Sequence, residues 1–502
     1  MPAEQMTSFY IEQFGCRATQ ADGAAIERQL RDRGCLATTD SGAADVVVVN
    51  TCTVTAAADS QARDAIRKIH ARNPAARVIV TGCYAQRAPE ELAALPGVTW
   101  VVGNSHKPQI PELAAGLTPG RLPSSAANGT FIPAETLLSI DSRQNDSYEN
   151  KAFSGVSAPA KILSGDILAQ STFLAAPVLG GEGNHTRPTL KIQDGCNSRC
   201  SYCVIPFVRG KSRSLPPNEV IAEIRSLSDS GYREIVLSGI NLGTYGRDLM
   251  PRVEFDDLLR RILDETPIER IRVSSVEPLD VTQDLIALFA STSRIAQHFH
   301  MPLQSASDRI LAAMHRWYRS EHYARRVELI REHLPHAAIG ADVIAGFPGE
   351  TENDHSATIS FIERLPFTYL HVFSFSKRPG TRAAAMPNEV PALTIRHRAR
   401  ELRALGERKA AAFHRTQVDR ALEVLTLRHT ALAARTPLTT RTSGTNPGWT
   451  PAISSNYLQV RLSGEWPANQ MMRARMICAA DGHVDANPET TEIFAVKHVT
   501  RG

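Results

Sequence analysis

Short runs of β-branched residues alternate with helical stretches along much of this chain, and this alternation most restricts the folds open to it. Residues 45–50 and 77–82 are apolar runs typical of strands buried on both faces of a parallel sheet. Residues 58–70 lie between them with apolar side chains at helical spacing, and 9–14 and 100–103 are two further expected strands. This order predicts an N-terminal parallel α/β domain.

A second series of expected strand–helix units fills the middle of the chain. Residues 234–237, 270–273 and 341–344 are short apolar strands, and each ends in small or polar residues. Helical stretches at 217–230 and 321–333 separate them. Repeated units of this kind predict a full or partial (β/α) barrel with its site at the carboxyl ends of the strands.

The remaining segments have weaker patterns. Residues 116–185 show no periodicity, and we expect a linker or extended surface loop there. Residues 393–420 predict an arginine-rich helix, and alternating segments such as 457–462 predict a small C-terminal β-barrel. The predicted divisions are an α/β domain over 1–115, a linker over 116–187, a central barrel over 188–415 and a terminal barrel over 416–502.

Composition excludes several classes of protein. With 42% hydrophobic and 22% charged residues, the chain of 502 residues is globular and not disordered. It has no run of about 18 apolar residues that would span a bilayer, and its first residues lack the order of a signal peptide. We therefore expect a cytoplasmic protein without a membrane partner. A net charge of +4 is compatible with a nucleic-acid partner but does not require one.

Three of the eight cysteines lie within eight residues: Cys196, Cys200 and Cys203, here called the loop cysteines. Because the cytosol keeps thiols reduced, this spacing predicts a metal site and not a disulfide. A structural zinc ion usually takes four ligands as two separated pairs, and no second pair is nearby. Three thiolates suit a 4Fe-4S cluster that leaves one iron open to a substrate.

Three further cysteines, Cys16, Cys52 and Cys83, each follow an expected strand of the N-terminal domain and are here called the sheet-edge cysteines. The carboxyl ends of parallel strands meet at one edge, so these thiols would lie close together. The alternative is three separate core cysteines. Cys35 and Cys478 lie outside both sets, and we expect inert thiols there.

The spacing of the loop cysteines, with Tyr202 before the last of them, resembles the signature of the radical S-adenosylmethionine superfamily. A wider resemblance, to the methylthiotransferase family, covers nearly the whole chain except 116–185, and its N-terminal part is carried by FGCRATQAD, NTCTVT and VTGCYAQ. It implies that the loop cysteines hold a 4Fe-4S cluster that binds S-adenosylmethionine. It also implies an auxiliary 4Fe-4S cluster on the sheet-edge cysteines. The terminal barrel resembles a TRAM domain, a small RNA-binding module.

The resemblance further implies the reaction. Two molecules of S-adenosylmethionine are used, one as methyl donor to a sulfur and one as radical source, and a methylthio group reaches C2 of an adenine. The strings SGINLGTYG, SSVEP and YLHVF favour the branch that acts on N6-threonylcarbamoyladenosine beside the anticodon of tRNA. Branches that act on N6-isopentenyladenosine in tRNA, or on a ribosomal-protein aspartate, are the alternatives. The expected partners of this monomer are the tRNA anticodon loop and an electron donor protein.

The resemblance also implies that Tyr202 lies against the adenine of the cofactor. Other site residues are assigned by position, and we expect polar groups after barrel strands to bind the rest of the cofactor: Gly239, Asn241, Glu277 and Gln304. Each would otherwise be an ordinary loop residue. We expect His300 and His371 to pack in the core.

Two departures from the family pattern, Thr19 in place of Asn and Ala306 in place of Gly, remove no expected ligand. Two rival interpretations remain: a radical enzyme acting on a small molecule, and an RNA-binding protein with structural metal sites.

Overall fold

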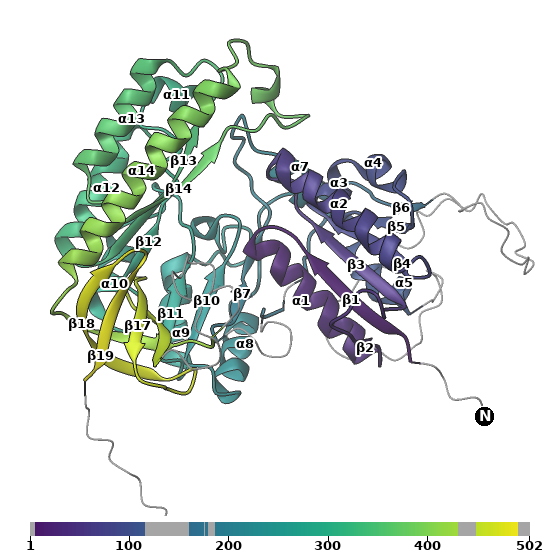
Figure 1. Cartoon of the computed structure of the whole chain (residues 1–502), viewed down its shortest axis with the longest axis horizontal. Helices are drawn as coiled ribbons and strands as arrows, with labels where there is room; N and C mark the ends of the chain where they lie inside the picture. Colours follow the sequence, from purple (N-terminus) through teal and green to yellow (C-terminus); the bar gives the residue numbers. More distant parts are fainter. Residues whose placement is uncertain (1–5, 116–159, 175, 179–185, 430–447, 490–502) are drawn as a thin grey trace, which may run out of the picture. The chain divides into compact units, whose positions relative to one another are not determined.

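The computed structural model describes residues 6–115, 160–174, 176–178, 186–429 and 448–489, and the chain forms two compact units that divide between Ile167 and Leu168 (Figure 1). None of the described helices is long and apolar enough to cross a membrane.

The first unit is built on a parallel sheet of six strands in the order β2-β1-β3-β4-β5-β6. Its strands are β1 Ser8–Gln13, β2 Leu36–Ala37, β3 Val46–Thr51, β4 Arg77–Gly82, β5 Val98–Val102 and β6 Lys161–Leu163. Its helices are α1 Arg17–Asp32, α2 Ala56–Arg72, α3 Cys83–Arg87, α4 Pro89–Ala93, η1 Asn104–Gln109 and α5 Ile110–Ala114. All of β3 is buried, so the expected parallel α/β architecture is confirmed.

Strand β6 corrects part of the predicted linker. Residues 161–163 pair with β5 and form the edge of the first sheet. A strand of three residues, partly exposed, is too short to produce a periodic pattern. Residues 116–159, 175 and 179–185 of the predicted linker lie outside the described residues.

The second unit contains six parallel strands: β7 Thr189–Lys191, β10 Glu234–Ser238, β11 Arg270–Val273, β12 His298–His300, β13 Ala338–Ala345 and β14 Tyr369–Ser374. They form the sheets β11-β10-β7 and β12-β13-β14, and single parallel bridges such as Ser275 to His300 link the two. The strands thus form an open arc, which is the expected partial barrel.

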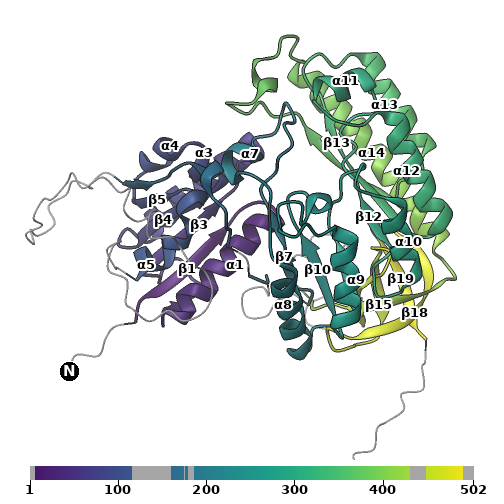
Figure 2. The same ribbon diagram turned by 180° about the vertical axis from the view of Figure 1, so that it is seen from behind.

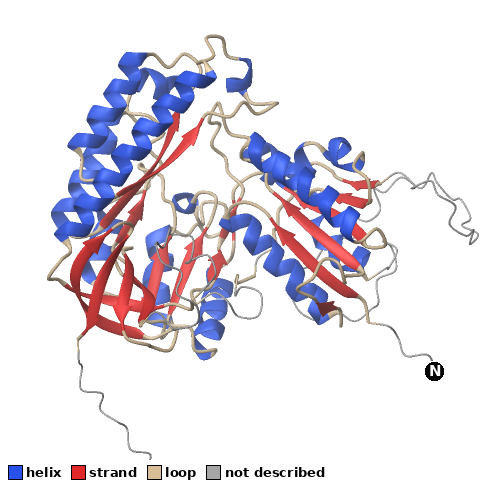
Figure 3. Cartoon of the chain, in the orientation of Figure 1, coloured by secondary structure: helices blue, strands red, loops and turns tan. Residues whose placement is uncertain are grey.

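The longer helices of this unit lie outside the arc, and Figure 3 shows strands and helices in separate layers. The described helices of the unit include α7 Ile205–Arg209, α8 Pro217–Asp229, η4 Leu242–Thr244, α9 Phe255–Glu265, α10 Gln283–Ser291, α11 Asp308–Ala313, α12 Ser320–His333, α13 Glu352–Arg364, η5 Arg382–Ala385 and α14 Ala392–Thr416. Both ribbon views place α12, α13 and α14 beside β12–β14 (Figures 1 and 2).

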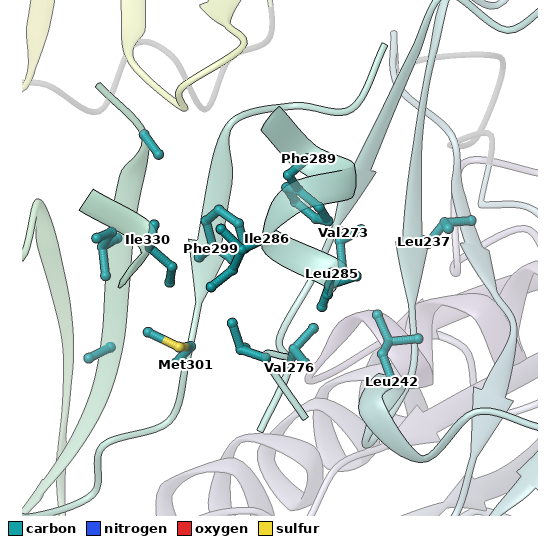
Figure 4. Packing of buried hydrophobic residues seen from close by; sticks show 14 of the residues in the cluster. Leu237, Leu242, Val273, Val276, Leu285, Ile286, Phe289, Phe299, Met301 and Ile330 are labelled. Atoms are coloured by element: carbon teal, nitrogen blue, oxygen red, sulfur yellow. The ribbon is translucent and has the colours of Figure 1, made fainter. Parts of the chain in front are cut away.

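Alternate residues of these strands face the helices. Val273 and Phe299 pack with Leu285 and Phe289 of α10 in the main hydrophobic core (Figure 4). Because side chains alternate along a strand, the residues between them point to the opposite side of the arc. We call that side the inner face, and its members include Glu234, Arg270, Arg272, His298, His300, Asp342, Tyr369 and His371.

The terminal barrel is closed in the order β15-β16-β17-β19-β18. Its strands are β15 Ala421–Thr426, β16 Trp449–Ser454, β17 Gln459–Ser463, β18 Met471–Ala480 and β19 His483–Pro488. Val424, Leu462 and Met476 are among its buried core residues. The expected small β-barrel is therefore confirmed, and its five strands are consistent with a TRAM domain.

A buried ion network joins this barrel to the arc. Arg270 and Arg272 bind the Glu234 carboxylate at 2.5 and 2.8 Å through their Nε atoms. Their other nitrogens donate to backbone carbonyls of the barrel, among them Ile453 at 3.2 Å and Ser454 at 2.9 Å. All three charged side chains are at most 1% exposed, so this interface is a structural part of the second unit.

Helix α14 ends earlier than predicted, at Thr416, and Arg420 lies outside it beside His336. Several of its cations are structural. Arg398 is buried against Glu350 at 2.8 Å, and Lys409 donates to the carbonyl oxygen of Leu365 at 2.6 Å. Part of the arginine-rich sequence therefore stabilises packing and is not presented to a partner.

Candidate active site

The loop cysteines lie between two short strands that pair with each other, β8 Gln193–Asp194 before them and β9 Arg213–Ser214 after them. The Cys196 N–H donates to the carbonyl oxygen of Gly210 at 3.1 Å, and the Cys203 N–H to that of Cys200 at 3.1 Å. Ser201 hydrogen bonds in turn to the backbone of Met314 and Ala383. The loop is therefore fixed to several elements of the arc.

The electrostatics of the loop favour a bound cation. Burial, together with the neighbouring Cys200 and Cys196, raises the pKa of Cys203 to about 12. Burial also raises the pKa of Cys196. Three thiolates so close together need compensating positive charge, which iron would supply. The donor set therefore fits a 4Fe-4S cluster.

Arg316 stands behind the loop cysteines. Its Nη1 donates to Cys200 Sγ at 3.3 Å, its Nη2 pairs with Glu277, and its side chain is 6% exposed. Burial raises the pKa of Glu277, although the Arg316 charge opposes the shift. Glu277, expected to bond the cofactor, thus lies at the site with a cationic partner that sequence reasoning missed. Arg316 is 116 residues from Cys200, and no local pattern marks it.

A buried ion cluster shapes the start of the cysteine loop. The Asp194 carboxylate forms ion pairs with Lys191 Nζ and Arg209 Nη1, each at 3.0 Å. It also accepts a hydrogen bond from the Gly195 N–H at 2.8 Å. Gly195 has a φ of +72°, and a Cβ there would lie 1.9 Å from the carbonyl oxygen of Lys211. Only glycine fits this turn without backbone movement.

We expect Gly195→Ala to lower the thermal midpoint and the iron bound by the loop cysteines, because the turn must shift. Left-handed backbone alone costs a non-glycine residue about 1–2 kcal/mol. The control is Gly231→Ala, which has a φ of +87° but no atom near the added Cβ. Thermal unfolding and iron assay of the two variants check this, and equal losses in both would contradict a role for the close contact.

Gln193 hydrogen bonds to the backbone that follows Gly239. Its Oε1 accepts the N–H groups of Ile240 at 2.8 Å and Asn241 at 2.9 Å, which therefore are not free for a cofactor carboxylate. A Cβ on Gly239 would lie 2.9 Å from the same oxygen. The side chain of Asn241 is buried, and its Oδ1 has no partner among the residues described.

Gln304 and Tyr202 also lie near the strand ends. Gln304 has a φ of +60°, pairs with Val343 of β13, and has a buried Oε1 without a partner in the described part of the chain. The Tyr202 ring meets Phe347 edge-on, with centroids 6.5 Å apart. Ala306, one of the departures, donates its N–H to Thr358 Oγ1 at 3.1 Å, a bond that glycine could also make.

The sheet-edge cysteines follow neighbouring strands of the first unit. Cys16 precedes α1, Cys52 follows β3 and Cys83 begins α3 directly after β4. A Cβ on Gly15 would lie 2.4 Å from Cys52 Cβ, so the first two loops touch. Thr51 pairs with Gly82, which brings the chain at Cys52 beside that at Cys83. One edge of the sheet therefore gathers all three.

The polar surroundings of this second set are modest. Cys16 Sγ lies 3.6 Å from Thr19 Oγ1, so the departure at residue 19 places a hydroxyl beside the thiol. Asn104 Nδ2 lies 3.7 Å from Cys83 Sγ. Cys52 and Cys83 are buried, whereas Cys16 is exposed. Three thiols of this kind suit iron better than a hard cation.

Comparisons with known proteins give this arrangement a context. Residues 8–103 match the family described as "Uncharacterized protein family UPF0004", and residues 190–362 match the radical SAM superfamily. The threonylcarbamoyladenosine tRNA methylthiotransferase MtaB of Aquifex aeolicus is 34% identical over 464 residues, which are 92% of this chain and 98% of that protein. The protein of the same name from Bacillus subtilis is 35% identical over 84% of this chain and 85% of its own.

This chain belongs to the radical SAM methylthiotransferase family.

Other relatives of this methylthiotransferase carry a different name. The tRNA-2-methylthio-N(6)-dimethylallyladenosine synthase of Syntrophobacter fumaroxidans is 34% identical over 76% of each chain. The radical S-adenosylmethionine methyltransferase TsrM of Kitasatospora setae, solved with cobalamin and a 4Fe-4S cluster, has a TM-score of 0.51 at 18% identity. That alignment covers 75% of this chain and 76% of TsrM and shows a shared fold.

Membership implies S-adenosylmethionine and a 4Fe-4S cluster for this methylthiotransferase, and the family implies a second cluster. Two sets of three thiols, one in each compact unit, match that requirement in number and chemistry.

Proposed function

We propose that this methylthiotransferase adds a methylthio group to C2 of N6-threonylcarbamoyladenosine beside the anticodon of tRNA. The observation that carries the proposal is the presence of two cysteine trios, each gathered after parallel strands. A radical enzyme without a sulfur-transfer task has no use for the sheet-edge cysteines. A protein with structural metal sites has no need of the buried Arg316–Glu277 pair behind Cys200.

The loop cysteines would hold the cluster that binds S-adenosylmethionine, and the sheet-edge cysteines the auxiliary one. When bound, the first cluster, fed by an external electron donor protein, supplies the electron that cleaves the cofactor to a hydrogen-abstracting radical. Arg316 fixes Cys200 and balances its charge. Asn241 Oδ1 and Gln304 Oε1 are buried acceptors suited to the ammonium and hydroxyl groups of the cofactor. Tyr202 would lie against its adenine.

Support for tRNA comes from the relatives and from the terminal barrel. Arg461 stands over the Trp449 ring at 4.9 Å, and His429 lies 5.1 Å from the same ring. A cation beside an aromatic ring suits stacking on an unpaired base, and the anticodon loop presents such bases.

The choice of nucleoside rests on fewer observations than the choice of tRNA. The relatives named for threonylcarbamoyladenosine are 34–35% identical, and one named for dimethylallyladenosine is 34% identical, so identity alone does not separate them. The SSVEP and YLHVF strings favour threonylcarbamoyladenosine. The isopentenyl-type substrate is the second candidate.

Mass spectrometry of tRNA nucleosides from cells that lack this gene tests the proposal. We expect the methylthio form of threonylcarbamoyladenosine to disappear and to return when the gene is restored. Loss of the methylthio group from isopentenyladenosine alone would overturn the choice of nucleoside. Anaerobic reconstitution should give about eight irons per chain, as two cubane clusters require.

A further inference from the structure

Three side chains from neighbouring strands meet on the inner face. They are His300 of β12, Asp342 of β13 and His371 of β14, here called the inner-face triad. His300 Nε2 lies 3.0 Å and His371 Nδ1 3.3 Å from Asp342 Oδ1. The expectation that both histidines pack in the core is wrong for His371, whose side chain is 53% exposed.

The side chain of Tyr369 holds this arrangement in place. The Tyr369 hydroxyl lies 2.9 Å from His300 Nδ1 and 2.7 Å from His298 Nε2, so it fixes both rings. Tyr369 can lie there because residue 340 is glycine, where a Cβ would be 1.9 Å from Tyr369 Cζ. His298 also stacks on Tyr457 of the terminal barrel, with centroids 4.3 Å apart.

Two polar atoms of the triad can still form hydrogen bonds with a ligand. His300 uses both ring nitrogens, and Asp342 Oδ1 meets both imidazoles. Asp342 Oδ2 and His371 Nε2 have no partner within the described segments, and the Asp342 side chain is 23% exposed. Burial alone would raise the pKa of Asp342, but the hydrogen bonds from His300 and His371 outweigh it and hold the pKa below its usual value. The site therefore offers an ionised acceptor beside a free imidazole nitrogen.

The triad lies close to the expected cofactor residues. Gln304 pairs with Val343, the residue after Asp342. A strand rises about 3.3 Å per residue, so the triad lies roughly one residue nearer the amino ends of the strands than Gln304. In adenine, only N1 and C6 separate C2 from N6. A base with C2 at the cofactor thus places its N6 substituent at this depth.

We propose that the inner-face triad binds the polar N6 substituent of the substrate nucleoside and selects a threonylcarbamoyl group over an isopentenyl group. This inference rests on the proposed function and extends it to named residues. With a proton on both ring nitrogens, His371 donates through Nδ1 to Asp342 Oδ1 and through Nε2 to the carboxylate of the substituent, and Asp342 Oδ2 accepts from its hydroxyl or ureido N–H. An apolar isopentenyl group would leave these polar atoms unpaired, which sites of this kind reject strongly.

Steady-state kinetics with defined tRNAs test the inference. His371→Ala and Asp342→Asn are each expected to lower kcat/KM for threonylcarbamoyladenosine tRNA by about 10- to 100-fold, chiefly through KM, since each removes a charged hydrogen bond. Activity on isopentenyladenosine tRNA should not fall in parallel. The control, His397→Ala on α14, removes a histidine 65% exposed beside Glu401 and should change neither value.

The outcomes separate the inference from the proposed function. If the unaltered protein modifies only isopentenyladenosine, the proposed function fails. If it modifies threonylcarbamoyladenosine, but both variants keep full kcat/KM with normal iron content and thermal midpoint, the triad inference alone fails. One divalent metal ion per chain that is lost in His371→Ala would also overturn it, because the same three side chains would then be metal ligands.

Discussion

Cys200→Ala should abolish cleavage of S-adenosylmethionine and remove about four irons per chain, because two thiolates do not retain a cubane cluster. Cys200 Sγ accepts a hydrogen bond from Arg316 Nη1. Removing this thiol therefore also removes one hydrogen-bond partner of the buried guanidinium group. Anaerobic reconstitution, iron and sulfide assays and chromatography of the cleaved cofactor measure the effect.

Two further variants complete this experiment. Cys52→Ala should remove a similar number of irons and abolish the methylthio product, while cofactor cleavage persists. Cys478→Ala is the matched control, since this thiol is exposed on β18 and outside both sets. Full iron content and cleavage in Cys200→Ala would rule out the assignment of the loop cysteines.

Glu234→Gln should lower the free energy of unfolding of the second unit by about 3–5 kcal/mol, since it leaves buried guanidinium groups without their counter-charge. Arg187, Arg270 and Arg272 all contact this carboxylate. The control is Glu269→Gln, which breaks an exposed pair with Arg233 and should cost at most about 1 kcal/mol. Denaturant unfolding followed by a probe in this unit measures both.

The difference in unfolding free energy between the unaltered protein and Glu234→Gln should change with pH in a defined direction. Burial would raise the pKa of Glu234, but Arg270, Arg272 and Arg187 outweigh it and hold the pKa far below its usual value of 4.5. A carboxyl with a depressed pKa in the folded state contributes fully above its unfolded pKa and loses that contribution as the pH falls. The stability gap to Glu234→Gln should therefore narrow below pH 4.5. A gap that widens there would refute this account.

Local pattern predicted the architecture well where single elements carry a strong signal. The Val46–Thr51 strand is buried throughout, and a run of valines is enough to mark it. The loop cysteines are close in sequence, so their spacing revealed them. The sheet-edge cysteines needed a topological argument, that parallel strands end together, and the structure places their loops as that argument expects.

Contacts between distant segments were beyond the reach of pattern. Arg316 reaches Cys200 only through folding, and Gln193 accepts hydrogen bonds from backbone N–H groups 47 and 48 residues away. His371 was misjudged because a histidine in an apolar run usually packs in a core, whereas alternation along β14 turns it to the inner face. Residues 161–163 were missed since their strand is only three residues long.

The position of β6 has a consequence for synthesis. The edge of the first sheet is completed by residues made about 60 positions after β5. At a translation rate of about 5–20 residues per second, the apolar edge of β5 stays unpaired for roughly 3 to 12 s on the ribosome. An open strand edge during that interval is a site for mispairing. Nascent chains halted when β5 but not β6 has left the ribosome should therefore be more protease-sensitive than chains halted after β6 has also emerged, and equal sensitivity would argue against this delay.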